Sequence, residues 1–88
     1  MKLIIAIVRD MDNDTVSHAL TQANFRVTYV ASTGGFLRKG QSTLMIGVED
    51  DLVNDALGII RKNVTPASES DQRHSIIFVI PVDQFHHF

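Results

Sequence analysis

The first half of the pattern of apolar and polar positions predicts a strand followed by a helix. Residues 3–8 are continuously apolar and rich in β-branched side chains, which is typical of a strand buried on both faces. Residues 9–14 are polar and predict a turn, in which Asn13 or Asp14 is placed to cap a helix. Over residues 15–23 apolar side chains then recur at the spacing of a helix with one buried face.

A second strand, residues 25–32, follows Asn24, which is suited to end the helix because asparagine tolerates a left-handed backbone. Side chains along a strand alternate between its two faces. We expect one face, with Phe25, Val27, Tyr29 and Ala31, to join the core, and the other to carry Arg26, Thr28, Val30 and Ser32.

The second half of the chain predicts a strand, a helix and a final strand. Residues 43–48 alternate as a strand, and Gly47 within it marks a place where a backbone or ligand can approach closely. The acidic residues 49–51 suit the N-terminus of a helix, whose apolar stripe continues to Val64. After a polar connection, residues 75–82 form an apolar last strand.

The resulting order βαββαβ predicts an α+β, ferredoxin-like fold, an antiparallel sheet with two helices on one face. We expect residues 1–88 to form a single domain of this kind. In this plan the last strand lies beside the first and at an edge of the sheet. An exposed edge as apolar as residues 76–82 favours aggregation unless it is covered, so we expect a homo-oligomer.

Composition narrows the function classes. The 88 residues carry a formal net charge of −2, which argues against a general DNA- or RNA-coating role. The absence of cysteine excludes disulfides, thiolate metal sites and thiol nucleophiles. The apolar run at residues 3–8 is too short to span a bilayer or to act as a signal peptide, so we expect a cytoplasmic protein without a membrane partner.

The segment Thr33-Gly34-Gly35-Phe36-Leu37-Arg38-Lys39-Gly40-Gln41 carries the most distinctive chemistry. Its three glycines permit close approach of the backbone to a ligand, and adjacent N–H groups can hold an anion. A phenylalanine and two cations complete a set that suits a planar ring with a phosphate, that is, a nucleotide. The alternative is a wide hairpin loop whose glycines only satisfy turn geometry.

Four blocks of the chain together resemble the PII-like cyclic-di-AMP receptors of Gram-positive bacteria. The blocks are Met1-Lys2-Leu3-Ile4-Ile5-Ala6-Ile7-Val8, Asn24-Phe25-Arg26-Val27-Thr28, Thr33-Gly34-Gly35-Phe36-Leu37-Arg38-Lys39-Gly40 and Pro81-Val82-Asp83-Gln84-Phe85-His86. The resemblance covers residues 1–64 and 75–88. It implies a signal-transduction protein without catalysis, a homotrimer that holds a cyclic dinucleotide in each cleft between subunits, and a downstream protein that the sequence does not identify.

The resemblance also implies a set of ligand-binding residues. They are Asn24, Arg26 and Thr28 on the second strand, Gly35, Phe36, Leu37 and Gln41 in and after the loop, Gly47 on the third strand, Phe78 on the last strand, and His87 near the end. In this set Arg26 answers phosphate charge, Thr28 and the loop N–H groups bond the ligand, and Phe36 or Phe78 packs against adenine.

Two residues and one segment depart from the family pattern. Gln41 stands where an asparagine that reads an adenine edge is usual, and His87 stands where a glutamine is usual. The connection at residues 65–75 is short where a long, ligand-responsive loop is usual. Two alternatives therefore stay open, a PII-like module that binds another adenine nucleotide and a ligand-free interaction trimer.

Other residue clusters favour simpler readings. His86 and His87 are adjacent, and successive strand residues point to opposite faces, so we expect neither to bind a metal. Asp10, Asp12 and Asp14 lack the other ligands of an EF-hand and predict a turn with a helix cap. No nucleophile accompanies Asp83 and His86 near the end of the chain, which argues against hydrolytic catalysis. Together with the resemblance, which implies no catalysis, this leads us to expect a protein that is not an enzyme and has no cofactor.

Overall fold

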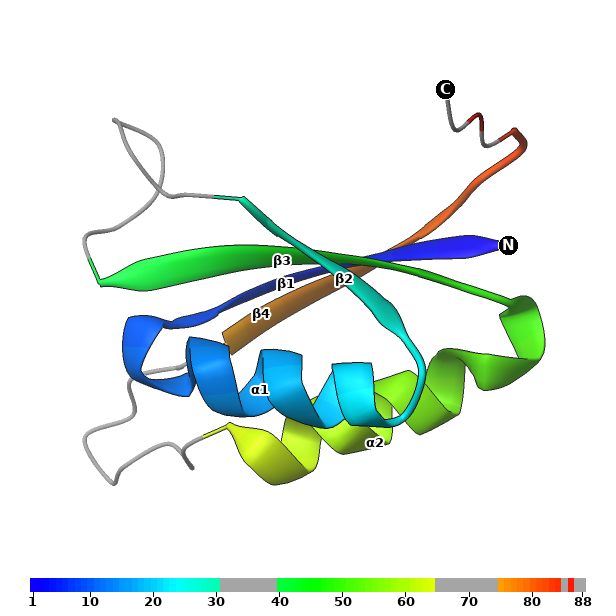
Figure 1. Cartoon of the computed structure of the whole chain (residues 1–88). Coiled ribbons are helices and arrows are strands. Elements are labelled where there is room, and N and C mark those ends of the chain that lie inside the picture. Colours follow the sequence, from blue (N-terminus) through cyan, green and yellow to red (C-terminus); the bar gives the residue numbers. More distant parts are fainter. Residues whose placement is uncertain (31–39, 65–74, 85, 87–88) are drawn as a thin grey trace.

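A four-stranded antiparallel sheet carries two helices on one of its faces, as Figure 1 shows for the computed structural model, which describes residues 1–30, 40–64, 75–84 and 86. The elements are β1 (Lys2–Arg9), α1 (Asp10–Gln22), β2 (Arg26–Val30), β3 (Gln41–Val48), a 3₁₀ turn η1 (Asp50–Leu52), α2 (Val53–Asn63) and β4 (Ser75–Pro81). This order and layering confirm the ferredoxin-like prediction.

The strands lie in the order β2-β3-β1-β4, so β4 is an edge strand beside β1, as predicted. The register places four residues in each row across the sheet, one from each strand. The central row of the face without helices consists of Thr28, Met45, Ile5 and Phe78. The neighbouring rows of that face are Arg26, Gly47, Leu3 and Ile80 on one side and Val30, Thr43, Ile7 and Ile76 on the other.

The hydrophobic core lies between the sheet and the helices. Alternate residues of β1 and β3 contribute Ile4, Ala6, Val8, Leu44, Ile46 and Val48, and the helices contribute Val16, Leu20, Ala56 and Ile60. Full burial of a Leu or Ile side chain stabilises the fold by about 1.5–3 kcal/mol, so this layer provides most of the favourable energy of a chain this small. Phe25, Val27, Val53, Leu57, Ile59 and Val64 pack against its margin.

The prediction that β1 is buried on both faces is wrong for the single chain. Only Ile4, Ala6 and Val8 are buried, because both helices cover the same face of the sheet. Leu3, Ile5 and Ile7 are half-buried on the other face, which we call the outer face. Alternate residues of the apolar run of β1 therefore face the core and the outer face, and no other element of the described chain covers the outer face.

Both helices begin differently from the prediction. The first strand passes directly into α1 at Asp10, so Asn13 and Asp14 lie inside the helix and do not cap it. The acidic residues Asp10 and Asp12 in the first turn favour this start through the helix dipole. The predicted turn at residues 9–14 is therefore the beginning of the helix. The acidic run 49–51 leads into η1, and α2 itself starts at Val53.

One residue expected in the core is largely exposed. Tyr29 is 53% exposed because it lies on β2, an edge strand. Leu52, the last residue of the 3₁₀ turn, is 39% exposed because it lies outside the buried stripe of α2. By contrast, Asn24 has φ of 71°, which confirms its predicted role in ending α1. No helix in the described part of the chain combines the length and hydropathy needed to cross a membrane.

Candidate functional site

A polar corner of the outer face is formed where β2 and β3 pair. Arg26 lies opposite Gly47, and Thr28 lies opposite Met45. Paired residues of adjacent strands point to the same face, so the guanidinium and the hydroxyl share the outer face. A Cβ at Gly47 would meet only the terminal methyl of Met1, at 3.4 Å. The glycine therefore keeps the surface low beside Arg26.

A cleft of about 510 Å³ opens at this corner. It is lined by Met1, Lys2, Leu3, Arg26, Thr28, Met45, Gly47 and Val82. Its size falls in the range of small-molecule sites, and most of its lining is apolar. Lys2 and Arg26 supply the positive charge and Thr28 supplies a hydroxyl, so we call it the cationic cleft. An anion with an attached apolar group fits this combination.

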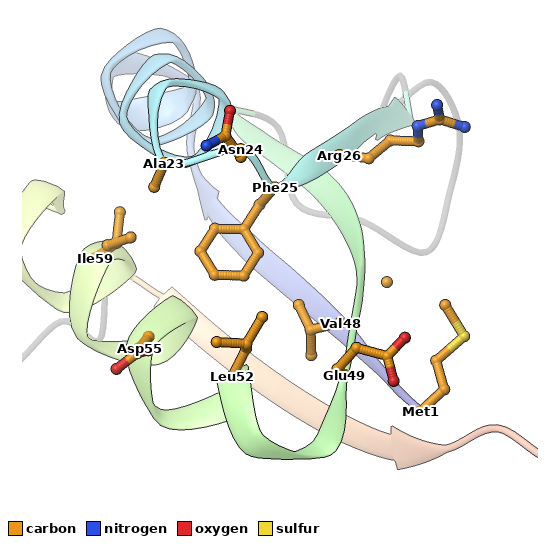
Figure 2. A pocket seen from close by; sticks show the side chains of 11 residues that line it. Met1, Ala23, Asn24, Phe25, Arg26, Val48, Glu49, Leu52, Asp55 and Ile59 are labelled. Carbon is orange, nitrogen blue, oxygen red and sulfur yellow. The ribbon is translucent and has the colours of Figure 1, made fainter.

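A second cleft of about 450 Å³ lies on the other side of the start of β2. Figure 2 shows Phe25, the residue before β2, pointing down toward Leu52, with Val48 beside them and Arg26 extending away from Phe25. Met1, Arg26 and Gly47 line both clefts, which therefore adjoin at these residues. The second cleft carries Glu49 and Asp55. We call it the acidic cleft.

The N-terminus is fixed between these clefts. Its ammonium group lies 2.9 Å from Oδ1 of Asp50, and the Val82 N–H donates to the Met1 carbonyl at 3.1 Å. The hydrogen bond from the N-terminal ammonium, together with the positive charge of Lys2, holds the pKa of Asp50 below its usual value of 3.8. These contacts fix Met1 where the two clefts meet.

The two clefts differ in net charge. Arg26 lines both of them, Lys2 adds a second cation to the cationic cleft, and Glu49 and Asp55 add two carboxylates to the acidic cleft. A phosphate group is therefore attracted more strongly to the cationic cleft. A ligand that carries both phosphate and uncharged rings would therefore place its phosphate beside Arg26.

The structure brings together only some of the residues expected to bind ligand. Asn24, Arg26 and Gly47 line the acidic cleft, and Arg26, Thr28 and Gly47 line the cationic cleft. The family resemblance pointed to all four residues; the alternation of the second predicted strand independently pointed to Arg26 and Thr28, and the glycine within the third strand pointed to Gly47. Gly35, Phe36, Leu37 and His87 lie outside the described residues.

Gln41 and Phe78 lie away from this corner in the same chain. Gln41 begins β3 six residues before Gly47, which corresponds to about 20 Å along a strand. Phe78 is three strands from Thr28 in the central row, about 14 Å across the sheet. One chain by itself therefore does not gather the described members of the set into one cleft.

Sequence reasoning missed several residues that line the clefts. Met1 and Met45 are not among the expected site residues, and Glu49 is expected only as a charge at a helix N-terminus. Only Met45 offered a signal in the sequence, because it lies two residues before Gly47 and therefore on the same face of that strand. The side chains of these residues set the apolar floor and the charge of the two clefts.

The histidines near the end of the chain do not join a cluster of metal ligands in the part of the chain that the structure describes. Groups of three or more His, Asp or Glu residues placed to hold a metal are absent among the described residues. The ring Nε2 of His86 lies 3.1 Å from Oε1 of Gln84. His87 lies outside the described residues, so the expectation about its metal binding stays a prediction.

Comparison with known proteins gives a family and a related structure. Residues 1–70 match the family model described as cyclic-di-AMP receptor. The chain is also similar to a crystallised, functionally unknown protein from Pediococcus pentosaceus ATCC 25745, with 35% sequence identity and a TM-score of 0.78. That similarity covers 99% of this chain and 96% of the other chain, so the two share the whole fold.

Proposed function

Because the chain belongs to the cyclic-di-AMP receptor family, we propose that it binds cyclic-di-AMP in clefts between the subunits of a homotrimer. The observation that carries this proposal is the pairing of Arg26 and Thr28 with Gly47 and Met45 on the outer face, beside a broad apolar surface. The proposed activity is binding for signalling, without chemical conversion of the ligand.

The outer face supports the association of subunits. Its β4 residues Ile76, Phe78 and Ile80 are 47%, 52% and 41% exposed, and both helices lie on the opposite face. Leu3, Ile5 and Ile7 continue the apolar surface onto β1. Contiguous apolar patches of this kind mark interaction surfaces, and further copies of this chain would bury the patch and cover the β4 edge.

Association also supports a compact ligand site. The separations of about 20 Å and about 14 Å within one chain leave Gln41 and Phe78 remote from Arg26. If a neighbouring subunit supplies one or both of these residues, the ligand meets the whole set in one cleft. We therefore assign Arg26 and Thr28 to one wall of the cleft and residues of a second copy to the other.

The roles of these groups follow from their chemistry. Arg26 forms charge-assisted hydrogen bonds to phosphate, and the Thr28 hydroxyl donates or accepts beside it. Phe78 offers an exposed ring for stacking against adenine. The Gln41 amide reads the polar edge of the base, and the loop residues Gly35, Phe36 and Leu37, together with His87, are assigned to the site by family resemblance.

The test is a calorimetric titration of the purified protein with cyclic-di-AMP. Loss of a hydrogen bond to a charged group costs about 1.5–3 kcal/mol, so Arg26→Ala should weaken binding by about tenfold or more. Arg61→Ala removes the same charge from an exposed position at the end of α2 and should leave the affinity unchanged. Equal affinities of both variants and the parent protein would remove Arg26 from the site.

A second candidate is favoured by the glutamine at position 41. Its side chain is one methylene longer than the usual asparagine, which moves the amide relative to the bound base. This change favours selectivity for another adenine nucleotide. Gln41→Asn should tighten cyclic-di-AMP binding if this reach limits it. Tighter binding of ATP than of cyclic-di-AMP by the parent protein would favour the second candidate, and failure to bind either would favour a ligand-free interaction trimer.

A further inference from the structure

Both neighbours of Gln41 are held by one residue at the start of α1. The backbone N–H of Asp10 donates to the carbonyl of Gly40 at 2.8 Å. The carboxylate Oδ1 of Asp10 accepts a hydrogen bond from the hydroxyl of Ser42. Asp10 is therefore hydrogen-bonded to the residues on both sides of Gln41, the residue expected to contact the base.

The geometry of β3 gives these two bonds a directional effect. Ser42 is 1% exposed and faces the helices, so Gln41, its neighbour in the strand, faces the outer side with Thr43 and Met45. Gly40 has φ of 88° and turns the chain into the strand. Anchoring Ser42 on the inner side therefore sets the direction in which Gln41 leaves the outer side.

We propose that Asp10 is a positioning residue for ligand binding, which acts by fixing the backbone at Gln41. The inference rests on the function proposed above. Asp10 occupies the first turn of α1, where an acidic residue commonly serves its own helix. Its carboxylate instead accepts a hydrogen bond from a hydroxyl 32 positions further along the chain, at the start of the strand that carries Gln41.

The bond has a local energetic consequence. With Asp10 truncated, the buried hydroxyl of Ser42 loses its acceptor. A buried donor left without a partner favours local rearrangement that restores contact with water. The rearrangement is centred on the first residues of β3, since the rest of this strand stays paired with β1 and β2 on both sides. Gln41 is the site residue most directly affected.

The experiment is a calorimetric titration with cyclic-di-AMP of full-length variants in a double-mutant cycle. Asp10→Ala should weaken binding about three- to tenfold, and Asp10→Asn, which keeps an oxygen acceptor for Ser42, should restore it to within about twofold. Asp14→Ala removes the same charge from an exposed position one turn along α1 and should have no effect. In a Gln41→Ala background, Asp10→Ala should cause no further loss.

The outcomes separate the possible errors. Ser42→Ala removes the bond that anchors the start of β3 without leaving a buried hydroxyl unpaired. It should therefore weaken binding in the same direction but by less than Asp10→Ala, and it replaces Asp10→Ala as the test if that variant fails to fold. Equal loss from Asp10→Ala with and without Gln41 would overturn the inference, as would equal affinities of the Asp10→Ala and Asp14→Ala proteins. Absence of binding by the parent protein and by Asp14→Ala would reject the proposed function itself, and the inference with it.

Discussion

The outer face of the sheet makes a quantitative prediction about assembly through Ile76. This residue is 47% exposed in the single chain, which leaves about 80 Å² of its surface in water, equivalent to about 2 kcal/mol when it is buried. Three subunits would together gain about 6 kcal/mol from this one position. Ile76→Glu removes that gain and also places a carboxylate in the interface, which costs several kcal/mol more per subunit.

The assay is light scattering of the purified protein at micromolar concentration. The parent protein should have three times the mass of one chain, and Ile76→Glu should have the mass of one chain. Its fold should survive, because an exposed substitution usually changes stability by less than about 0.5 kcal/mol. Met11→Glu is the matched control, since Met11 is 62% exposed on α1 on the other side of the sheet.

Two results would refute this reasoning. A parent protein that already has the mass of one chain would show that the outer face is not an interface. A trimeric Ile76→Glu variant, or dissociation of the Met11→Glu variant to the same extent, would show that the subunits meet through another surface.

Three further predictions test local features of the structure. Gly40→Ala should lower the free energy of unfolding by about 1–2 kcal/mol, because a Cβ has space there but the backbone φ of 88° is strained for alanine. Gly58→Ala inside α2 should raise it by about 0.5–1 kcal/mol, because alanine is the better helix former. Equal effects of the two substitutions in urea unfolding would contradict the left-handed conformation of Gly40. Glu49→Gln should tighten cyclic-di-AMP binding about two- to fivefold in calorimetry by removing a negative charge near the phosphate site, and unchanged affinity would place the ligand elsewhere. The lowered pKa of Asp50 means that its contact with the Met1 ammonium stabilises the fold above about pH 4 and that this stabilisation is lost as the pH falls further. Asp50→Asn should therefore reduce the fall in melting temperature below about pH 4. An unchanged fall would show that the contact is too exposed to stabilise the fold.

The fold was largely predictable because its local signals agree with one another. Alternation identified the buried face of β3, helical spacing identified α1 and α2, and the order of elements placed β4 at an edge beside β1. The start of α1 was not predictable in the same way. A mostly polar run such as residues 9–14 suits both a turn and the first turn of a helix, and composition does not separate the two.

The candidate site was predictable only in part, since a sequence pattern assigns a residue to a face and does not assign it to a cleft. Arg26 and Thr28 were correctly assigned to one face of β2, and the structure adds that Arg26 lies opposite Gly47. The distance of Gln41 and Phe78 from that corner depends also on the register of the strands, which becomes known only with the structure. The apolar outer face was misread for the same reason, since continuous apolarity in β1 does not say what covers its second side.

The most direct test of the proposed function is a calorimetric titration of the parent protein with cyclic-di-AMP, cyclic-di-GMP and ATP under identical conditions. If the proposed function is correct, the protein binds one cyclic-di-AMP per chain saturably, that is, three per trimer, and binds the other two nucleotides more weakly. Absence of heat and of any melting-temperature shift at millimolar cyclic-di-AMP would contradict it.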